Sequence, residues 1–395
     1  MKFLSSQLST NHIPASELEH VLLMQLDGVS GVVMLSPALR ALREALPHTE
    51  LTLMTSAAGG QLAPLLPWVD NVMVDQTIRQ DDFGIRSINP RDDIAFVERL
   101  RRHNFSIALI FNSISQSPLR AAYACYLAGI PYRVGFANGT SGSILSHGLL
   151  PPSDELHQVD RNLKLLQAIG ISIPDSRTEL SIPESVGNRA NELLSSAGLE
   201  LNIPYIVLAP GAIGTLSQYA PDHFAAVARI LSAQTEQQLV VVGNSVEAKT
   251  IQPVLQVADK NLYGNIYSLV EKTTLPELAA VIRQASLTIA NNSVSMHFAD
   301  VFGRPMVIVH SETEMSNQWR PRHASARLLS RPAICSDCNQ MECPNGINCL
   351  DVRPEEVAIA ALEMLSKESY NDQPTYKGIL AYQLKSELQE QSSLR

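Results

Sequence analysis

Two short segments in the second half of the chain combine glycine and polar residues directly after apolar runs. The first segment carries Gly211 and Ala212, and the second carries Gly243 and Glu247. Glycine lets a backbone approach a ligand closely, and a carboxylate just after a strand can accept hydrogen bonds from ribose hydroxyls. A plainer interpretation of each also stands: an ordinary strand-to-helix turn, and an acid favoured at a helix N-terminus.

A third segment, NNSVSMH, follows the apolar run that ends at residue 290. It supplies Asn291, Asn292, Ser293 and, about one helical turn later, His297. Asn and Ser are good N-caps, and the histidine could equally be a satisfied core residue. Three such polar turns in one half of the chain nevertheless favour a nucleotide-binding site.

These turns need parallel sheets to position them, and the sequence pattern supplies two. Short β-like runs alternate with helical patterns over 21–180 and again over 200–365, which predicts an α/β fold with two Rossmann-like domains, parallel sheets and a central cleft. Residues 1–20 are a polar leader and 366–395 a polar tail.

The same pattern makes three local predictions. Helices are expected over 37–45 and 247–258, and the runs 287–290 and 306–309 are expected to be the last strands. The glycine-bearing residues before 37 are expected to form a turn, because an apolar strand runs into them and a helical pattern follows them.

The bulk composition excludes several classes of protein. The chain has 395 residues, of which 45% are hydrophobic and 17% charged, so it can bury substantial cores. A formal net charge of −9 argues against a nucleic-acid partner. No apolar stretch is long enough to span a membrane, and the N-terminus lacks the apolar core of a signal peptide. We therefore expect a cytoplasmic protein, and peripheral contact at the inner face of the cytoplasmic membrane is compatible with this expectation.

Four of the five cysteines, Cys335, Cys338, Cys343 and Cys349, lie within fifteen residues. Such spacing can place four thiolates around one zinc ion, and a site with four sulfur ligands would be structural. An iron–sulfur cluster, a set of packed thiols and a pair of disulfides are the alternatives.

Several segments in the same order resemble one known family. They are LDGVSGVVMLSPALRALREALPHTELTLM near the start, GIPYRVGF, APGA, the turn with Gly243 and Glu247, NNSVSMHFADVFGRP and the cysteine segment. The chain resembles glycosyltransferase family 9, the ADP-heptose:lipopolysaccharide heptosyltransferase group. The resemblance implies a GT-B architecture and inverting transfer of a sugar from a nucleotide-diphospho-sugar to a lipopolysaccharide or other envelope glycan, with no metal in the chemistry. It also implies an acceptor in the N-terminal half and an ADP-heptose-like donor in the C-terminal half.

The chain departs from the family at three positions. The presumed catalytic Asp of the family matches Gly31, a basic phosphate-binding residue falls near Gln218, and an Asp matches Asn292. General-base assistance is typically worth about 10²–10⁴-fold, so a replacement base is needed. Asp27 is the nearest candidate, although it could instead cap the turn. Restoring the family residue with Gly31→Asp is expected to raise activity if the cleft is otherwise intact.

Lost positive charge at Gln218 would weaken stabilisation of the departing diphosphate. Arg320 and Arg322 are the hypothetical substitutes. The rival hypothesis is a catalytically impaired GT-B relative that binds a nucleotide, sugar or protein, and a sugar-nucleotide epimerase is weaker still. Binding of a donor without transfer would support the catalytically impaired relative, whereas transfer activity would exclude it.

Overall fold

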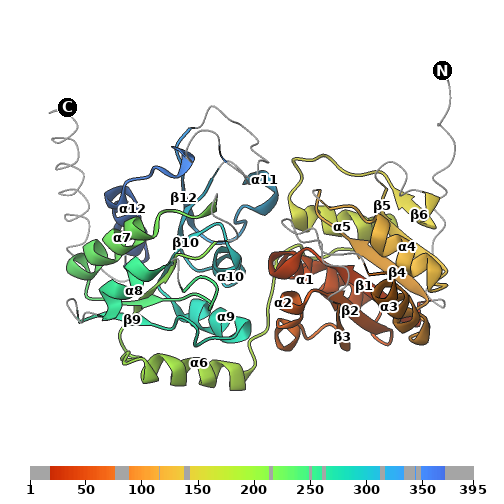
Figure 1. Ribbon diagram of the computed structural model, residues 1–395, viewed down its shortest axis with the longest axis horizontal. Coiled ribbons are helices and arrows are strands. Elements are labelled where there is room, and N and C mark those ends of the chain that lie inside the picture. The colour runs from red at the N-terminus through yellow and green to blue at the C-terminus, as the bar shows by residue number, and fades with distance from the viewer. Residues whose placement is uncertain are drawn as a thin grey trace. The chain divides into compact units, whose positions relative to one another are not determined.

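The protein is described here by a computed structural model. The described residues are 18–75, 89–114, 116–137, 143–212, 217–248, 251–259, 264–311, 316–332, 343 and 348–369. The chain divides into two compact units, 1–181 and 182–395. Each unit holds a six-stranded parallel sheet covered by helices (Figure 1).

Unit 1 has the strand order β3-β2-β1-β4-β5-β6. Its strands are β1 (His20–Gln25), β2 (Glu50–Thr55), β3 (Asn71–Val74), β4 (Ile107–Phe111), β5 (Tyr132–Phe136) and β6 (His147–Leu149). Its helices are α1 (Gly28–Ala45), α2 (Ala57–Gly60), η2 (Ala63–Leu65), α3 (Pro90–Arg102), α4 (Leu119–Leu127) and α5 (Gln158–Ala168). The chain order changes direction between β1 and β4, so the carboxyl ends of these two strands meet at a switch point, where parallel α/β sheets bind ligands.

Unit 2 has the order β12-β11-β10-β7-β8-β9. Its strands are β7 (Tyr205–Ala209), β8 (Gln238–Val241), β9 (Ile266–Ser268), β10 (Leu287–Asn291), β11 (Met306–Val309) and β12 (Ala326–Leu329). Its helices are α6 (Glu184–Ser196), α7 (Pro221–Gln234), α8 (Gln252–Asp259), α9 (Leu275–Gln284), α10 (Val294–Val301), α11 (Ser316–Trp319), η5 (Asn348–Leu350) and α12 (Pro354–Ser369). Here the switch point lies between β7 and β10.

The central strands are buried along their length and mostly apolar because helices cover both faces of each sheet; Gln238, Thr288 and Asn291 are buried polar residues at or within them. Every residue of β4, β7, β8 and β10 is buried. This burial fixes the register of the strands, so the residues that directly follow them are held at defined positions.

The first helix begins nine residues earlier than the sequence predicted. The prediction of a turn before Pro37 was wrong: α1 starts at Gly28, and Pro37 lies inside it. Proline lacks the N–H that would bond the carbonyl of Val33. The hydroxyl of Ser36 donates to that carbonyl at 2.8 Å instead, so the helix continues through the proline.

The end of unit 1 is fastened to the same helix. The hydroxyl of Ser36 accepts the backbone N–H of Glu179 at 3.0 Å. Arg40, one turn further along α1, forms ion pairs with Asp175 and Glu179 and donates to the carbonyl of Arg177. Residues 175–179 therefore pack as part of unit 1.

Other boundaries also differ from the sequence prediction. The helix expected over 247–258 starts as α8 at Gln252, after a separate turn. Two edge strands, β6 and β12, extend the sheets; both are short and half-exposed, so their apolar signal is weak. Helix α5 was not predicted because charged and amide residues occupy its buried face.

Within the described part of the chain, no helix is both long and apolar enough to cross a membrane.

Candidate active site

The carboxyl ends of β7 and β8 bring Gly211, Gly243 and Glu247 together in unit 2. A Cβ added to Gly211 would lie 2.2 Å from both Cδ and Oε1 of Glu247. A Cβ at Gly243 would lie 3.3 Å from Oε2 of the same carboxylate. Only glycine at position 211 leaves room for this carboxylate. Gly211, Gly243 and Glu247 therefore pack directly against one another.

Glu247 is held in place by a reciprocal pair of bonds with Asn244. Its Oε2 accepts the backbone N–H of Asn244 at 2.9 Å, and the side chain of Asn244 accepts the N–H of Glu247 at 3.0 Å. This is the geometry of a capping box, which supports the plainer interpretation for one carboxylate oxygen. Partial burial raises the pKa of Glu247 above its usual value, and the Asn244 N–H opposes the rise.

Asn291 is part of the frame that holds this loop. It is fully buried, and its amide nitrogen donates to the carbonyls of Pro210 (2.8 Å) and Gly211 (3.2 Å). Its amide oxygen accepts the N–H of Tyr219 at 3.0 Å. We therefore assign Asn291 a positioning role, because the described contacts occupy both ends of its amide.

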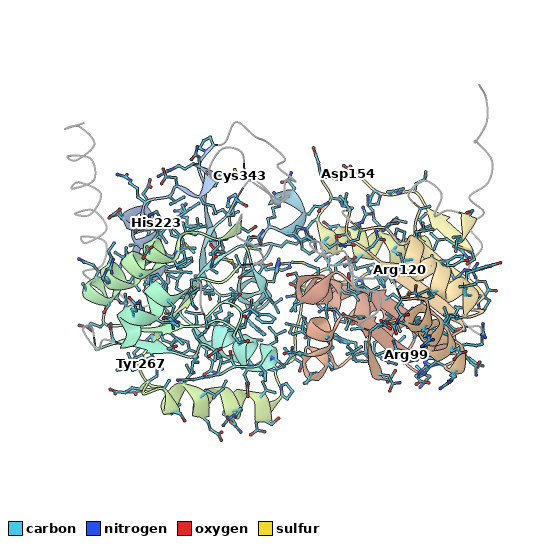
Figure 2. The ribbon with its side chains drawn as sticks, viewed as in Figure 1. Arg99, Arg120, Asp154, His223, Tyr267 and Cys343 are labelled. Atoms are coloured by element: carbon cyan, nitrogen blue, oxygen red, sulfur yellow. The ribbon has the colours of Figure 1, made fainter. Side chains whose placement is uncertain are left out.

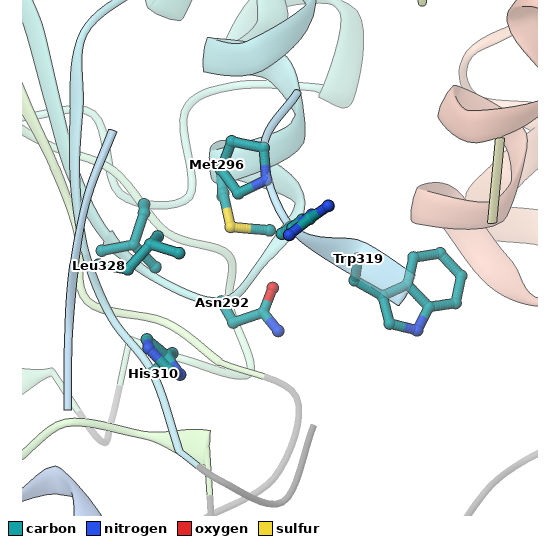
Figure 3. Close-up of a pocket in the computed structure, with 8 residues that line it drawn as sticks. Asn292, Met296, His310, Trp319 and Leu328 are labelled. Carbon is teal, nitrogen blue, oxygen red and sulfur yellow. The ribbon is translucent and has the colours of Figure 1, made fainter. Parts of the chain in front are cut away.

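The turn after β10 forms the wall of a shallow, open pocket whose volume is about 20 Å³. Asn292, Met296, His310, Trp319 and Arg320 are among its lining residues, and Figure 3 shows the first four of them around the opening. The sequence indicated Asn292 and, as a hypothesis, Arg320; it gave no signal for His310 or Trp319, which belong to segments without a recognisable motif.

Ser293 and His297 directly follow two of the lining residues, Asn292 and Met296, in the sequence. Ser293 occupies the N-cap position of α10, but its side chain makes no capping hydrogen bond, so capping does not explain its presence. His297 is 3% exposed, and its ring centroid lies 6.1 Å from that of Trp319. Because His297 is buried and packs near Trp319, it can hold this lining residue of the pocket in position.

A buried acid fixes the loop that carries Arg320. The carboxylate of Asp300 accepts backbone N–H groups from Arg322, His323 and Ala324 at 2.8–3.0 Å. Arg320, which lines the pocket, lies two residues before this anchored segment, whereas the backbone of Arg322 is bound directly by Asp300.

Gln218 and Ala212 flank the segment 213–216, which lies outside the described residues. The side chain of Gln218 donates weakly to the carbonyl of Pro210 at 3.4 Å, and Ala212 is half-buried. Both residues therefore belong to the loop that Asn291 holds.

Unit 1 presents a different arrangement at the carboxyl ends of β1 and β4. Asp27 occupies the N-cap position of α1 without making a side-chain capping bond; its Oδ2 accepts the N–H of Ser113 at 2.8 Å. Arg161 of α5 donates from Nε to the carbonyl of Asn112 at 3.0 Å. That carbonyl and that N–H belong to the same peptide group, so a cation and an anion polarise it from opposite ends.

Arg161 is almost completely buried, 1% exposed, and its guanidinium lies over the ring of Phe136, 4.8 Å from the centroid. Burial lowers the pKa of Arg161, and the charges of Asp154 and Asp27 oppose the change. Sequence reasoning missed this residue because the helix that carries it was not predicted.

Several buried polar atoms near this pair find no hydrogen-bond partner among the described residues. They are Gln25 Nε2, Asn112 Oδ1, Gln158 Oε1 and Arg161 Nη1. All four come from the ends of β1 and β4 or from α5. Buried polar groups are normally satisfied, so this cluster has capacity for water or a polar ligand.

Gly31 lies in the first turn of α1, close to the same cluster. A Cβ at this position would lie 2.9 Å from Cδ and Oε1 of Gln25 and 3.0 Å from Cβ of Asp27. The side chain of Gln25 also accepts the N–H of Asp27 through its Oε1 at 3.0 Å. Gln25 and Asp27 thus occupy the space where a side chain at position 31 would begin.

Two of the four clustered cysteines, Cys335 and Cys338, lie outside the described residues. Cys349 is buried and Cys343 is half-buried, and neither forms a disulfide with another described cysteine. Among the residues that the structure describes, no group of three or more His, Cys, Asp or Glu side chains could hold a metal ion. Zinc at this cluster stays a prediction.

Comparison with known proteins shows which family this chain resembles. The family described as glycosyltransferase family 9 (heptosyltransferase) matches residues 94–348. Lipopolysaccharide heptosyltransferase 3 of Escherichia coli strain K12 is 24% identical over 317 residues, which cover 75% of this chain and 90% of the relative.

Two solved structures share the arrangement of elements. The E. coli ADP-heptose lps heptosyltransferase II superposes with a TM-score of 0.70 at 18% identity, over 89% of this chain and 99% of that one. The E. coli heptosyltransferase WaaC with ADP-2-deoxy-2-fluoro heptose gives 0.64 at 15% identity, over 88% and 99%.

The paired parallel sheets define a GT-B-type α/β fold, as the sequence predicted. The chain belongs to glycosyltransferase family 9, and it is accordingly a glycosyltransferase of the heptosyltransferase type.

Proposed function

We propose that this protein transfers a heptose from a nucleotide-diphospho-heptose to a sugar hydroxyl of a lipopolysaccharide-type glycolipid. The observation that carries the proposal is the convergence of Gly211, Gly243 and Glu247 at two neighbouring strand ends of unit 2. Glycine there lets the backbone approach a diphosphate, and Glu247 offers a carboxylate to the ribose.

The choice of donor is supported by the relatives. A structural neighbour binds an ADP-heptose analogue, and the E. coli relative is named for lipopolysaccharide. The pocket between Asn292 and Arg320 adds a cation near the same edge, where the departing diphosphate needs charge stabilisation.

The acceptor is assigned to the strand ends of unit 1. Gln25, Asn112, Gln158 and Arg161 hold unsatisfied polar atoms there, which suit the hydroxyls of a sugar. The charges of Asp154 and Asp27 both act on Arg161, but it is Asp27 that is hydrogen-bonded to the peptide group at the end of β4, so we assign Asp27 the role of general base. Its anchoring to Ser113 keeps one oxygen at a fixed position, which a base requires.

The reaction is a single displacement with inversion. The acceptor oxygen forms a bond to the anomeric carbon of the heptose while the bond from that carbon to the diphosphate breaks. The proton of the acceptor hydroxyl passes to the carboxylate of Asp27, and the nucleoside diphosphate leaves with the bonding electrons. The substrate being a glycolipid, we place the reaction at the inner face of the cytoplasmic membrane.

The test combines calorimetry and product analysis. Titration with ADP and UDP, followed by mass spectrometry of reactions with ADP-heptose and deacylated lipopolysaccharide core, should show ADP binding and a heptose added to the acceptor. Glu247→Ala should weaken ADP binding, and Glu192→Ala, an exposed acid on α6, is the control. Binding of ADP without any transfer would instead support the rival binding protein, which the comparisons do not favour.

For the cysteine cluster we propose a structural zinc ion with no part in the reaction. The spacing of the four cysteines and the buried position of Cys349 support it. Elemental analysis after purification under reducing conditions should give one zinc per chain; a chain without stoichiometric metal contradicts this proposal.

A further inference from the structure

Helix α4 of unit 1 exposes an apolar and aromatic stripe. Leu119, Tyr123, Tyr126 and Leu127 are between 36% and 55% exposed, although they are among the larger apolar side chains of the unit. Their spacing places them on one face of the helix. The opposite face is made of small residues, Ala121, Ala122, Ala124 and Cys125, which pack on the core.

Arginines surround this stripe. The guanidinium of Arg133 lies over the ring of Tyr126, 5.4 Å from its centroid. Arg101 of α3 donates to the carbonyl of Leu127 at 2.8 Å, and Arg120 forms a 2.8 Å ion pair with Asp93. Figure 2 labels Arg120 within this part of unit 1.

Helix α3 extends the apolar area. It packs beside α4 (Figure 1), and Ile94 is 60% exposed. Ile94 and Arg101 are seven residues apart, so they share one face of α3. We call the surface formed by Ile94, Leu119, Tyr123, Tyr126, Leu127, Arg101, Arg120 and Arg133 the α3–α4 face.

We propose that the α3–α4 face docks unit 1 on the surface of an anionic phospholipid bilayer. Tyrosine, leucine and isoleucine side chains at this exposure can enter the headgroup region, where tyrosine is favoured. The exposed Arg101 and Arg120 can keep their stems on the apolar residues and place their charges among anionic headgroups. Arg133 instead donates to the carbonyls of Ile130 and Ile144 and holds the ring of Tyr126 in place.

Charge complementarity selects this partner. The acids of this face are Asp93, paired with Arg120, and Glu98, which is exposed one helical turn from Ile94. Three arginines outnumber these two acids, so the face is positive whereas the chain as a whole carries a net charge of −9. A two-fold contact between copies would bring two patches of the same positive sign together, which their mutual repulsion disfavours. The proposal rests on the proposed function only in its purpose, which is to hold the enzyme where a glycolipid acceptor lies.

Vesicle co-sedimentation tests the proposal directly. The full-length protein should bind phosphatidylcholine vesicles that contain phosphatidylglycerol more tightly than pure phosphatidylcholine, and salt should weaken the binding. Tyr123→Ser combined with Tyr126→Ser should lower the partition coefficient about tenfold or more. Arg120→Gln should lower it about fivefold on anionic vesicles only.

Matched controls come from unit 2. Leu201→Ser removes another half-exposed leucine, and Arg229→Gln removes another exposed arginine; neither should change vesicle binding. Thermal melting must show that the double tyrosine variant still folds.

Three results would overturn the proposal: no binding to anionic vesicles, binding that survives the tyrosine substitutions, or a dimer in sedimentation velocity that Tyr126→Ser abolishes. Transfer to deacylated core oligosaccharide separates this proposal from the proposed function. That reaction needs no bilayer, so it should be unchanged in the tyrosine variants whether or not the face binds lipid.

Discussion

The strand-end edges of the two units stabilise their carboxylates in different ways. In unit 1, Asp27 shares one peptide group with the buried cation Arg161, so opposite charges support each other. In unit 2, Glu247 is held against Gly211 by a backbone N–H of Asn244, and burial raises its pKa.

This difference indicates different tasks. The carboxylate of Asp27 is fixed by the N–H of Ser113, which suits a group that must accept a proton at a defined place. A carboxylate packed against glycines is defined chiefly by shape, which suits a group that accepts hydrogen bonds from a bound nucleotide. The four predictions below test this contrast, in order of decreasing effect.

Asp27→Asn should lower the rate of transfer by about 10²–10⁴-fold, because the amide cannot accept the acceptor's proton. ADP binding should stay unchanged, since the substitution is confined to unit 1. Initial rates and calorimetry on the same preparation measure both quantities. Asp222→Asn on α7 serves as the control, and a transfer rate within a few fold of the parent would remove Asp27 from the mechanism.

Gly211→Ala should weaken ADP binding about 10–100-fold, because its Cβ would displace the carboxylate of Glu247 and overpack the loop. Calorimetry measures the change. Gly187→Ala in α6 is the matched control: a Cβ there meets nothing within 4 Å, so binding should be unaffected. Unchanged ADP affinity in Gly211→Ala would show that the glycine–glutamate contact lies away from the nucleotide.

Gly31→Asp alone should destabilise the protein by about 1–3 kcal/mol rather than restore activity, because its Cβ would collide with Gln25. Combining it with Gln25→Ala removes the collision and should raise transfer above that of Gly31→Asp. Chemical denaturation and initial rates compare the two variants with Gln25→Ala alone. A fully stable, more active Gly31→Asp would mean that Gln25 moves aside without cost.

Glu247→Gln should leave the melting temperature unchanged or raise it by at most about 4 °C at neutral pH. A carboxyl whose folded-state pKa is raised is harder to ionise in the folded protein, so its charge opposes folding above that pKa and ceases to do so as the pH falls. Asp27→Asn should instead lower the melting temperature, because Arg161 loses a compensating charge. Calorimetric melts across the acid range compare both variants; a shift of the same sign in both would remove the contrast.

The sequence predicted the site residues at the strand ends of unit 2 better than those at the strand ends of unit 1. In unit 2 the relevant side chains follow apolar strands within a few residues, so Gly211, Gly243, Glu247 and Asn292 were all indicated by local pattern. The roles of these residues could not be predicted from local pattern. Asn291 holds the loop in place and is not exposed to a ligand, and this role depends on hydrogen bonds to residues about eighty positions away.

In unit 1 the decisive partners are distant in the sequence and unusual in type. Arg161 lies 134 positions from Asp27 and faces the protein interior, where arginine is rarely found. Pro37 gave a false helix start because the compensating hydroxyl of Ser36 has no signature of its own. The fold class depends on average periodicity and was predictable, but such individual pairings were not.

The hydrogen bonds and ion pairs that hold residues 175–179 on α1 determine where a recombinant fragment of unit 1 should end. A recombinant unit 1 that stops after α5 would leave Arg40 without Asp175 and Glu179, and would remove the bond from Ser36 to Glu179. The backbone N–H of Ser181 also donates to the carbonyl of Leu65. An expression fragment meant to fold alone should therefore extend through Ser181.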